Sequence, residues 1–80
     1  MYKSILKENI NKIHTTKLGV NRIKNNLTIN NDVVEYCKKI ILDKKSKIIE
    51  QGKNYYCKFG DIIITINKHT YTIITAHKSK

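Results

Sequence analysis

The chain contains no proline and no tryptophan, and it has only three glycines and one phenylalanine. Without proline-rich or glycine-rich stretches, it offers no linker and no low-complexity segment that would separate two domains. With so few large aromatic residues, isoleucine must supply most of the core packing. The 80 residues are therefore expected to form a single domain, residues 1–80, of marginal stability, because chains of this size bury only roughly 60% of their unfolded surface.

Acidic residues are also scarce: 6 Asp and Glu stand against 16 Lys and Arg, which gives a formal net charge of +10. The acidic residues are scattered, so no carboxylate pair indicates a two-metal nuclease, and there is no zinc spacing and no glycine-rich phosphate loop. We therefore expect no metal and no cofactor. The positive charge favours a polyanionic partner, RNA first. It would equally fit an acidic antitoxin or immunity-type protein, or simply keep a small domain soluble.

Long apolar runs are missing as well, since none approaches the ~20 residues of a membrane span. The first residues also lack the apolar segment of a secretory signal. We expect a cytoplasmic protein without membrane contact. The two cysteines, Cys37 and Cys57, match no metal or redox spacing and are expected to be buried free thiols.

The spacing of apolar residues changes once, near residue 45, and before that point it is helical. It predicts a first helix over residues 2–12 and a third over residues 31–43, capped by Asn30 or Asn31. Between them, Thr15 or Thr16 can cap a second helix whose inner face carries Val20, Ile23 and Leu27.

After residue 45 the apolar residues alternate or run continuously, which predicts strands over residues 47–50, 55–59, 62–67 and 71–76. The connections are short, and the pair Gly60-Asp61 is typical of a hairpin, so the strands should be antiparallel. The sequence thus predicts an α+β fold, with two to three N-terminal helices packed on a four-stranded antiparallel sheet. The second face of that sheet would be polar and free to bind a ligand.

Polar side chains gather in two segments. His14-Thr15-Thr16 begins the second helix, where free backbone amides can hold a phosphate. Alternatively, the threonines only cap the helix and His14 is solvent-exposed. In the last strand, alternation predicts one polar row of Tyr71, Thr75 and His77, interrupted by Ile73, and one packed row of Thr72, Ile74 and Ala76.

Histidine can act as general base or acid near neutral pH, so His14 and His77 are the candidate pair for RNA cleavage without metal, in either order. Arg22 is the only arginine, and its planar fork of donors matches phosphate, although a surface salt bridge is the alternative. His77 could likewise belong to a frayed C-terminal tail.

A third polar stretch, Lys53-Asn54-Tyr55-Tyr56, combines a cation, an amide and two aromatic rings. A tyrosine can stack a base and a lysine can pair with phosphate. Either ring could be the one in the core, so the stretch predicts one packing ring and one binding ring.

Four stretches of the chain carry a family resemblance that runs from about residue 9 to near the C-terminus. They are Ile13-His14-Thr15-Thr16-x-Leu18-Gly19-x-x-Arg22-Ile23, Gly52-Lys53-Asn54-Tyr55-Tyr56, Ile64-Thr65-Ile66-Asn67 and Tyr71-Thr72-Ile73-Ile74-Thr75-Ala76-His77-Lys78. Together they resemble a small bacterial and phage domain family of uncharacterised function, whose members often have Trp where Tyr55 stands. The order of elements and the ending Ile74-Thr75-Ala76 are more remotely similar to the barnase–EndoU–colicin–RelE superfamily of small RNases and toxins.

The remote resemblance implies an active site on the open face of the sheet, with residues of an early helix turned toward it. The leading hypothesis is a metal-independent endoribonuclease that acts as a toxin or in phage–host conflict and cleaves RNA by attack of the 2′-OH. The alternatives are a non-catalytic RNA- or DNA-binding protein and a basic inhibitor of an acidic protein. The expected catalytic residues are His14, Arg22, Tyr71, Thr75 and His77, and the expected substrate-binding residues are Thr15, Thr16, Lys53, Asn54, Tyr55 and Lys78.

Overall fold

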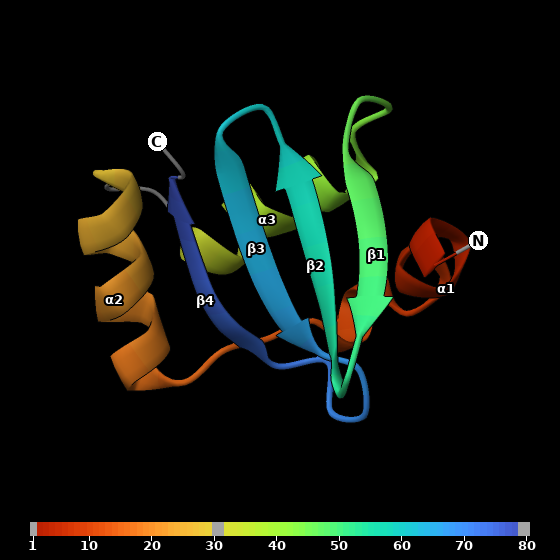
Figure 1. The fold of residues 1–80 in the computed structure, drawn as a ribbon. Coiled ribbons are helices and arrows are strands. Elements are labelled where there is room, and N and C mark those ends of the chain that lie inside the picture. The colour runs from red at the N-terminus through yellow and green to blue at the C-terminus, as the bar shows by residue number, and fades with distance from the viewer. Residues whose placement is uncertain (1, 30–31, 79–80) are drawn as a thin grey trace.

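A computed structural model describes residues 2–29 and 32–78 of the chain. The elements follow in the order α1 (Tyr2–Glu8), a short 3-10 helix η1 (Ile10–Lys12), α2 (Lys17–Leu27), α3 (Val33–Leu42), β1 (Lys47–Gln51), β2 (Asn54–Phe59), β3 (Ile62–Asn67) and β4 (Ile73–Lys78). The strands form one antiparallel sheet in the order β1-β2-β3-β4 (Figure 1). The predicted α+β fold is therefore confirmed.

Side chains cap the two longer helices where they begin. The Thr16 hydroxyl accepts a hydrogen bond from the Gly19 N–H at 3.1 Å at the start of α2. At the start of α3, the Asp32 carboxylate accepts from the backbone of the two residues that follow Val33. The predicted caps Asn30 and Asn31 lie outside the described residues. None of the helices in the described ranges is long and apolar enough to cross a membrane.

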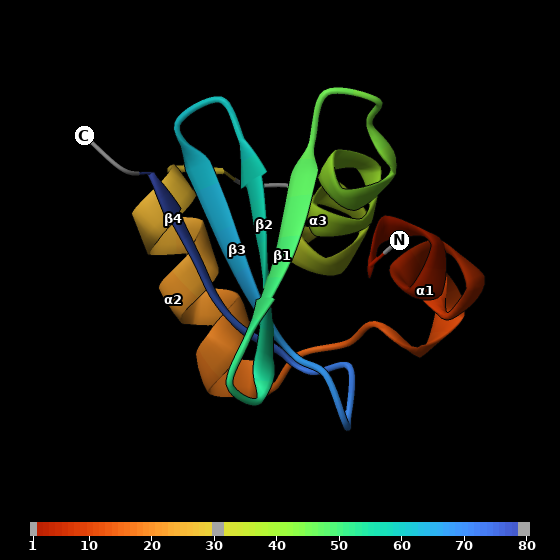
Figure 2. The same cartoon turned by 45° about the vertical axis from the view of Figure 1, so that its right-hand side comes forward.

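The helices cover one face of the sheet and leave the other bare. Helix α3 crosses behind the sheet, while α1 and α2 lie beside the outer strands β1 and β4 (Figures 1 and 2). The core lies between α3 and the sheet. Its fully buried side chains include Leu6, Ile23, Cys37, Ile41, Cys57, Ile64, Ile66 and Ile73. We call the bare side the open face, because no helix of the described residues covers it.

A β-bulge in β4 changes which of its side chains reach the core. The pairing with β3 runs from Thr65↔Thr75 directly to Ile66↔Ile73, so Ile74 is an extra, unpaired residue. Ile73 is 1% exposed, whereas Ile74 is 40% exposed. The prediction that Ile74 packs while Ile73 lies in the polar row is therefore wrong, because the bulge breaks the strict alternation on which it depends.

Candidate nucleic-acid interface

The side chains of the open face alternate with core residues along each strand, and the register aligns them in rows across the sheet. The lysine row consists of Lys47, Lys58, Ile63 and His77. The tyrosine row consists of Ile49, Tyr56, Thr65 and Thr75. The amide row consists of Gln51, Asn54 and Asn67. Successive rows are two residues apart along the strands, which is roughly 7 Å.

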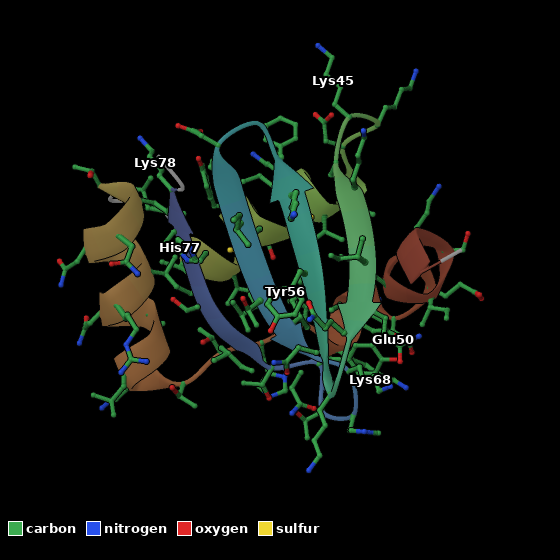
Figure 3. The ribbon with its side chains drawn as sticks, in the orientation of Figure 1. Lys45, Glu50, Tyr56, Lys68, His77 and Lys78 are labelled. Carbon is green, nitrogen blue, oxygen red and sulfur yellow. The ribbon has the colours of Figure 1, made fainter. Side chains whose placement is uncertain are left out.

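Tyr56 supplies the aromatic ring of the open face. It is half-buried and projects from the middle of the sheet toward the viewer in Figure 3. Its neighbour Tyr55 points to the opposite side and is only 6% exposed in the core. The prediction that Tyr55 contacts a substrate is therefore not supported by its position. Alternation gives that surface position to Tyr56, the other ring of the pair.

The lysine row places two positive charges directly opposite each other. Lys47 on β1 and Lys58 on β2 are Cα partners, and both side chains are exposed. Like charges in this arrangement repel and destabilise a sheet. At the far end of the same row, His77 on β4 is half-buried beside Ile63. An anion that lies along this row would relieve the repulsion between the two lysines.

None of the open-face side chains in the three rows is acidic. The acidic residue of β1, Glu50, alternates to the other side of the strand and forms an ion pair with Lys68 (Figure 3). Exposed Lys53 lies in the turn before β2, whereas exposed Lys78 at the end of β4 pairs with the core residue Ile62 and alternates away from the open face. The open face is therefore a polar surface with an excess of positive charge.

His14 lies against the beginning of β4. The backbone of His14 forms a parallel bridge with Thr72: its N–H donates to the Tyr71 carbonyl at 3.2 Å, and its carbonyl accepts from the Ile73 N–H at 2.7 Å. The fold thus brings the first predicted polar segment to the last strand. The residues that meet His14, however, are Thr72 and its neighbours and not Thr75 or His77.

The hydrogen bonds of the His14 ring define its tautomer. Its Nδ1 lies 2.8 Å from the Lys12 carbonyl oxygen, which can only accept, so Nδ1 carries a proton. In the neutral ring Nε2 is then an acceptor, and the Thr72 hydroxyl 3.1 Å away donates to it. Thr72 in turn accepts from the Thr70 hydroxyl at 2.8 Å. His14 is held as an exposed, oriented imidazole with its basic nitrogen engaged by a hydroxyl.

The two candidate catalytic histidines lie at opposite ends of β4. His14 pairs with Thr72, and five residues of extended chain, roughly 16 Å, separate Thr72 from His77. One phosphate cannot bridge that separation. The predicted arrangement of His14 and His77 as base and acid on one phosphodiester therefore has no support in the fold. Thr75 stays near His77, because both lie on the open-face side of β4.

Tyr71 leaves the predicted polar row because of its backbone. It precedes β4, has a positive φ of 58°, and donates its N–H to the Asn67 carbonyl at 2.8 Å. Its ring lies 5.8 Å from the Lys12 ammonium. Tyr71 is thus a turn residue with a cation–π partner and belongs to the His14 end of the strand.

Helix α2 lies alongside the outer edge of β4. Side chains of α2 and of the segment before it donate hydrogen bonds to backbone carbonyl groups of β4. The Thr15 hydroxyl donates to the Ile73 carbonyl at 2.8 Å, and the Asn26 amide donates to the Ala76 carbonyl at 3.3 Å. Arg22 lies one turn before Asn26, on the same side of α2, and is exposed. Thr15 and Thr16 therefore have structural partners within the protein, whereas Arg22 is an exposed residue of α2.

Gly19 marks the closest approach between α2 and the segment before it. A Cβ built on Gly19 would overlap the Thr15 hydroxyl oxygen and would lie 3.3 Å from the Thr16 hydroxyl oxygen. Glycine at this position therefore makes room for the Thr15 side chain that reaches β4. Close packing within the protein therefore explains why position 19 is a glycine.

The remaining reactive groups lie in the core. Cys37 and Cys57 are buried free thiols, as predicted. Burial, together with the nearby Cys57 thiol, raises the pKa of Cys37 from its ordinary 9.0 to about 12. Within residues 2–29 and 32–78, no group of three or more His, Cys, Asp or Glu is arranged to hold a metal ion.

Tyr56, Lys47, Lys58 and Thr72 are site residues that sequence reasoning did not select. A signal for Tyr56 and Lys58 was present, because the alternation of Tyr55, Cys57 and Phe59 toward the core places these two residues on the other face. No comparable signal existed for Thr72, whose contact with His14 joins residues 58 positions apart.

The chain was compared with known proteins at the levels of family, sequence and structure. A family model described as a protein of unknown function (DUF3781) matches residues 7–77. No curated protein and no solved structure matches the chain. The expected membership in a small uncharacterised family is confirmed, while the remote resemblance to RNases and toxins stays a prediction.

Proposed function

We propose that this chain, which belongs to the DUF3781 family of proteins of unknown function, binds single-stranded RNA on the open face of its sheet. The observation that carries the proposal is the composition of that face. A half-buried tyrosine lies at its centre, two opposed lysines lie in the next row, and no acidic side chain lies in any of the three rows.

Each part of this surface suits one part of a nucleotide. Every base has a π-face, so a tyrosine on a flat sheet can stack a base whatever its identity. Lysines pair with phosphate and release counterions when they do so. The Thr75 hydroxyl, in the same row as Tyr56, can exchange a hydrogen bond with a 2′-OH, which is the group that distinguishes RNA from DNA.

The charge of the rest of the chain supports the same partner. The formal charge of +10 raises the local concentration of a polyanion and speeds its association. Exposed Lys53, in the turn before β2, can add a phosphate contact beyond the lysine row. An acidic protein would respond to the same charge, so the test below includes an acidic polypeptide as a competitor.

The test is fluorescence anisotropy with a labelled RNA 12-mer, at several salt concentrations. We expect the affinity to fall steeply with salt, Tyr56→Leu to weaken binding roughly 5- to 150-fold, and Lys58→Glu to weaken it further. The matched controls, Tyr36→Leu and Lys39→Glu on α3, should retain wild-type affinity.

Two outcomes would overturn RNA binding by this face. One is the absence of binding at low salt. The other is an equal loss of affinity in the α3 controls, which would indicate attraction by net charge alone. A DNA 12-mer of the same sequence is expected to bind more weakly. If an acidic polypeptide competes as well as RNA and Tyr56→Leu is without effect, the basic inhibitor is the better description.

Metal-independent RNA cleavage is the second candidate, and the His14 tautomer favours it. The Lys12 carbonyl holds the proton on Nδ1, which leaves Nε2 as the basic nitrogen. In such a reaction Nε2 would accept the proton of the 2′-OH, the 2′-oxygen would attack phosphorus, and the bond to the 5′-oxygen would break. The departing 5′-oxygen would take a proton from water, and the His14 imidazolium would return its proton to the solvent. The products would be a 2′,3′-cyclic phosphate and a free 5′-OH. A role as a toxin or in phage–host conflict would follow from this activity.

Cleavage is tested by incubating RNA with the pure protein in EDTA. Because the two histidines lie at opposite ends of β4, we expect His14→Ala to abolish cleavage and His77→Ala to leave it largely intact. RNA that remains whole with the wild-type protein would reject the activity without affecting the binding proposal. Equal cleavage by His14→Ala would remove His14 as the base.

A further inference from the structure

We infer that the base stacked on Tyr56 is read at its edge by Asn54, and that the open face therefore prefers adenine. This inference rests on the proposed RNA binding. Asn54 lies two residues before Tyr56 on the same face of β2, and its amide nitrogen is 3.5 Å from the Tyr56 hydroxyl. The amide thus stands at the outer end of the ring, where the edge of a stacked base would extend.

The rows on the two sides of Tyr56 orient the bound nucleotide. The lysine row lies two residues along the strands from the tyrosine row, roughly 7 Å, and the amide row lies at a similar spacing on the other side. Phosphates would follow Lys47 and Lys58. The base would then point across Tyr56 toward Asn54, so backbone contact and base contact fall on different rows.

The other two amide side chains of the row, Gln51 and Asn67, differ in the hydrogen bonds that they can form with a base. The side-chain oxygen of Asn67 already accepts from the backbone N–H groups of His69 and Thr70, at 2.8 and 3.0 Å. Asn67 is thereby committed to the turn before β4. Gln51 is exposed and is the Cα partner of Asn54 across the hairpin. Asn54 and Gln51 therefore form the pair that can present both a donor and an acceptor to a base.

Amide chemistry selects among the bases. An asparagine or glutamine amide offers an N–H donor beside a C=O acceptor, which matches the N6–H donor and N7 acceptor of adenine. Guanine presents two acceptors at the equivalent edge and would leave the amide oxygen without a partner. One such two-bond contact discriminates between bases by roughly 5- to 150-fold.

The test uses the RNA 12-mers A12, C12 and U12 with the wild-type protein and matched variants. We expect A12 to bind at least about fivefold more tightly than C12 and U12. Asn54→Leu should remove this preference and leave the affinity for U12 nearly unchanged. Lys58→Gln should weaken all three oligonucleotides alike. Asn21→Leu, on an exposed position of α2, is the control and should behave as wild type.

A second variant, Asn54→Gln, keeps the amide and should keep part of the preference for A12. It distinguishes the loss of the amide from a folding defect. Thermal unfolding of each variant shows that it is folded. Equal binding of all three oligonucleotides by the wild type, or an undiminished preference in Asn54→Leu, would overturn base reading while RNA binding stands. If none of the oligonucleotides binds, the proposed function fails together with this inference.

Discussion

Lys47 and Lys58 lie directly opposite each other on neighbouring strands, and no acidic side chain of the open face lies in their row. Their repulsion costs stability in the free protein, so removing one charge should have opposite effects on folding and on RNA binding. This contrast separates a functional pair of lysines from lysines that only keep the protein soluble.

We expect Lys58→Gln to raise the free energy of unfolding by about 0.2–1 kcal/mol at low salt, because the like-charge pair disappears. The same variant should bind RNA more weakly. Urea unfolding and fluorescence anisotropy measure the two effects. At 1 M salt the gain in stability should vanish, because screening removes the repulsion. Lys39→Gln on α3, an exposed position, should change neither quantity, and a loss of stability in Lys58→Gln would contradict the prediction.

Gly19→Ala should destabilise the protein by about 1–3 kcal/mol, although alanine is the better helix former. The added Cβ would overlap the Thr15 hydroxyl oxygen, which is bonded to the Ile73 carbonyl. In a protein that already carries Thr15→Ala, Gly19→Ala should lower the free energy of unfolding much less than it does in the wild type. Urea unfolding of the four proteins gives the coupling energy. Additive effects would show that Thr15 is not the residue that Gly19 accommodates.

His14 and Thr72 should be energetically coupled through the bond between Nε2 and the Thr72 hydroxyl. We expect His14→Ala and Thr72→Val each to lower the free energy of unfolding, with a coupling of about 0.5–1.5 kcal/mol in the double variant, the usual contribution of one hydrogen bond. The measurement is a double-mutant cycle by urea unfolding at pH 8. The pair His69→Ala and Thr72→Val serves as the comparison, because no side-chain hydrogen bond joins His69 to Thr72 among the described residues, so this pair should show no coupling.

Stability should fall as the pH rises from 9.0 toward about 12, because the pKa of Cys37 is raised over that window. The unfolded thiol loses its proton near 9.0 while the folded thiol keeps it, so the unfolded state binds fewer protons and gains relative to the folded state. Below pH 9.0 this contribution is fully present. Urea unfolding of wild type and Cys37→Ala at pH 8 and pH 10 checks it. The decline should be steeper in the wild type, and parallel declines would assign it to other groups.

The fold was accessible from the sequence because its signals are local. Helical spacing changes to strand spacing near residue 45, and short turns join neighbouring strands, the first two of them with glycine at Gly52 and Gly60, so each strand finds its partner within one hairpin. The end of the chain was less predictable. Alternation fails at Ile74, because a bulge depends on how β4 pairs with β3, and that pairing is not encoded in the residues of β4 alone.

The candidate site was only partly predictable for a related reason. The RNase hypothesis required the His14 segment to meet the last strand, and it does, but residue types do not specify where along the strand the contact falls. It falls at Thr72, roughly 16 Å from His77. The choice between Tyr55 and Tyr56, in contrast, was predictable, because Tyr55 alternates with the apolar residues Cys57 and Phe59 in the sequence.

Helix α2 and the residues before it occupy outward-facing backbone groups of β4, at Ile73 and Ala76. A sheet edge that is filled in this way resists pairing with a strand of another molecule. Continuous fibres need two free edges, so the placement of α2 disfavours edge-to-edge polymerisation of this protein.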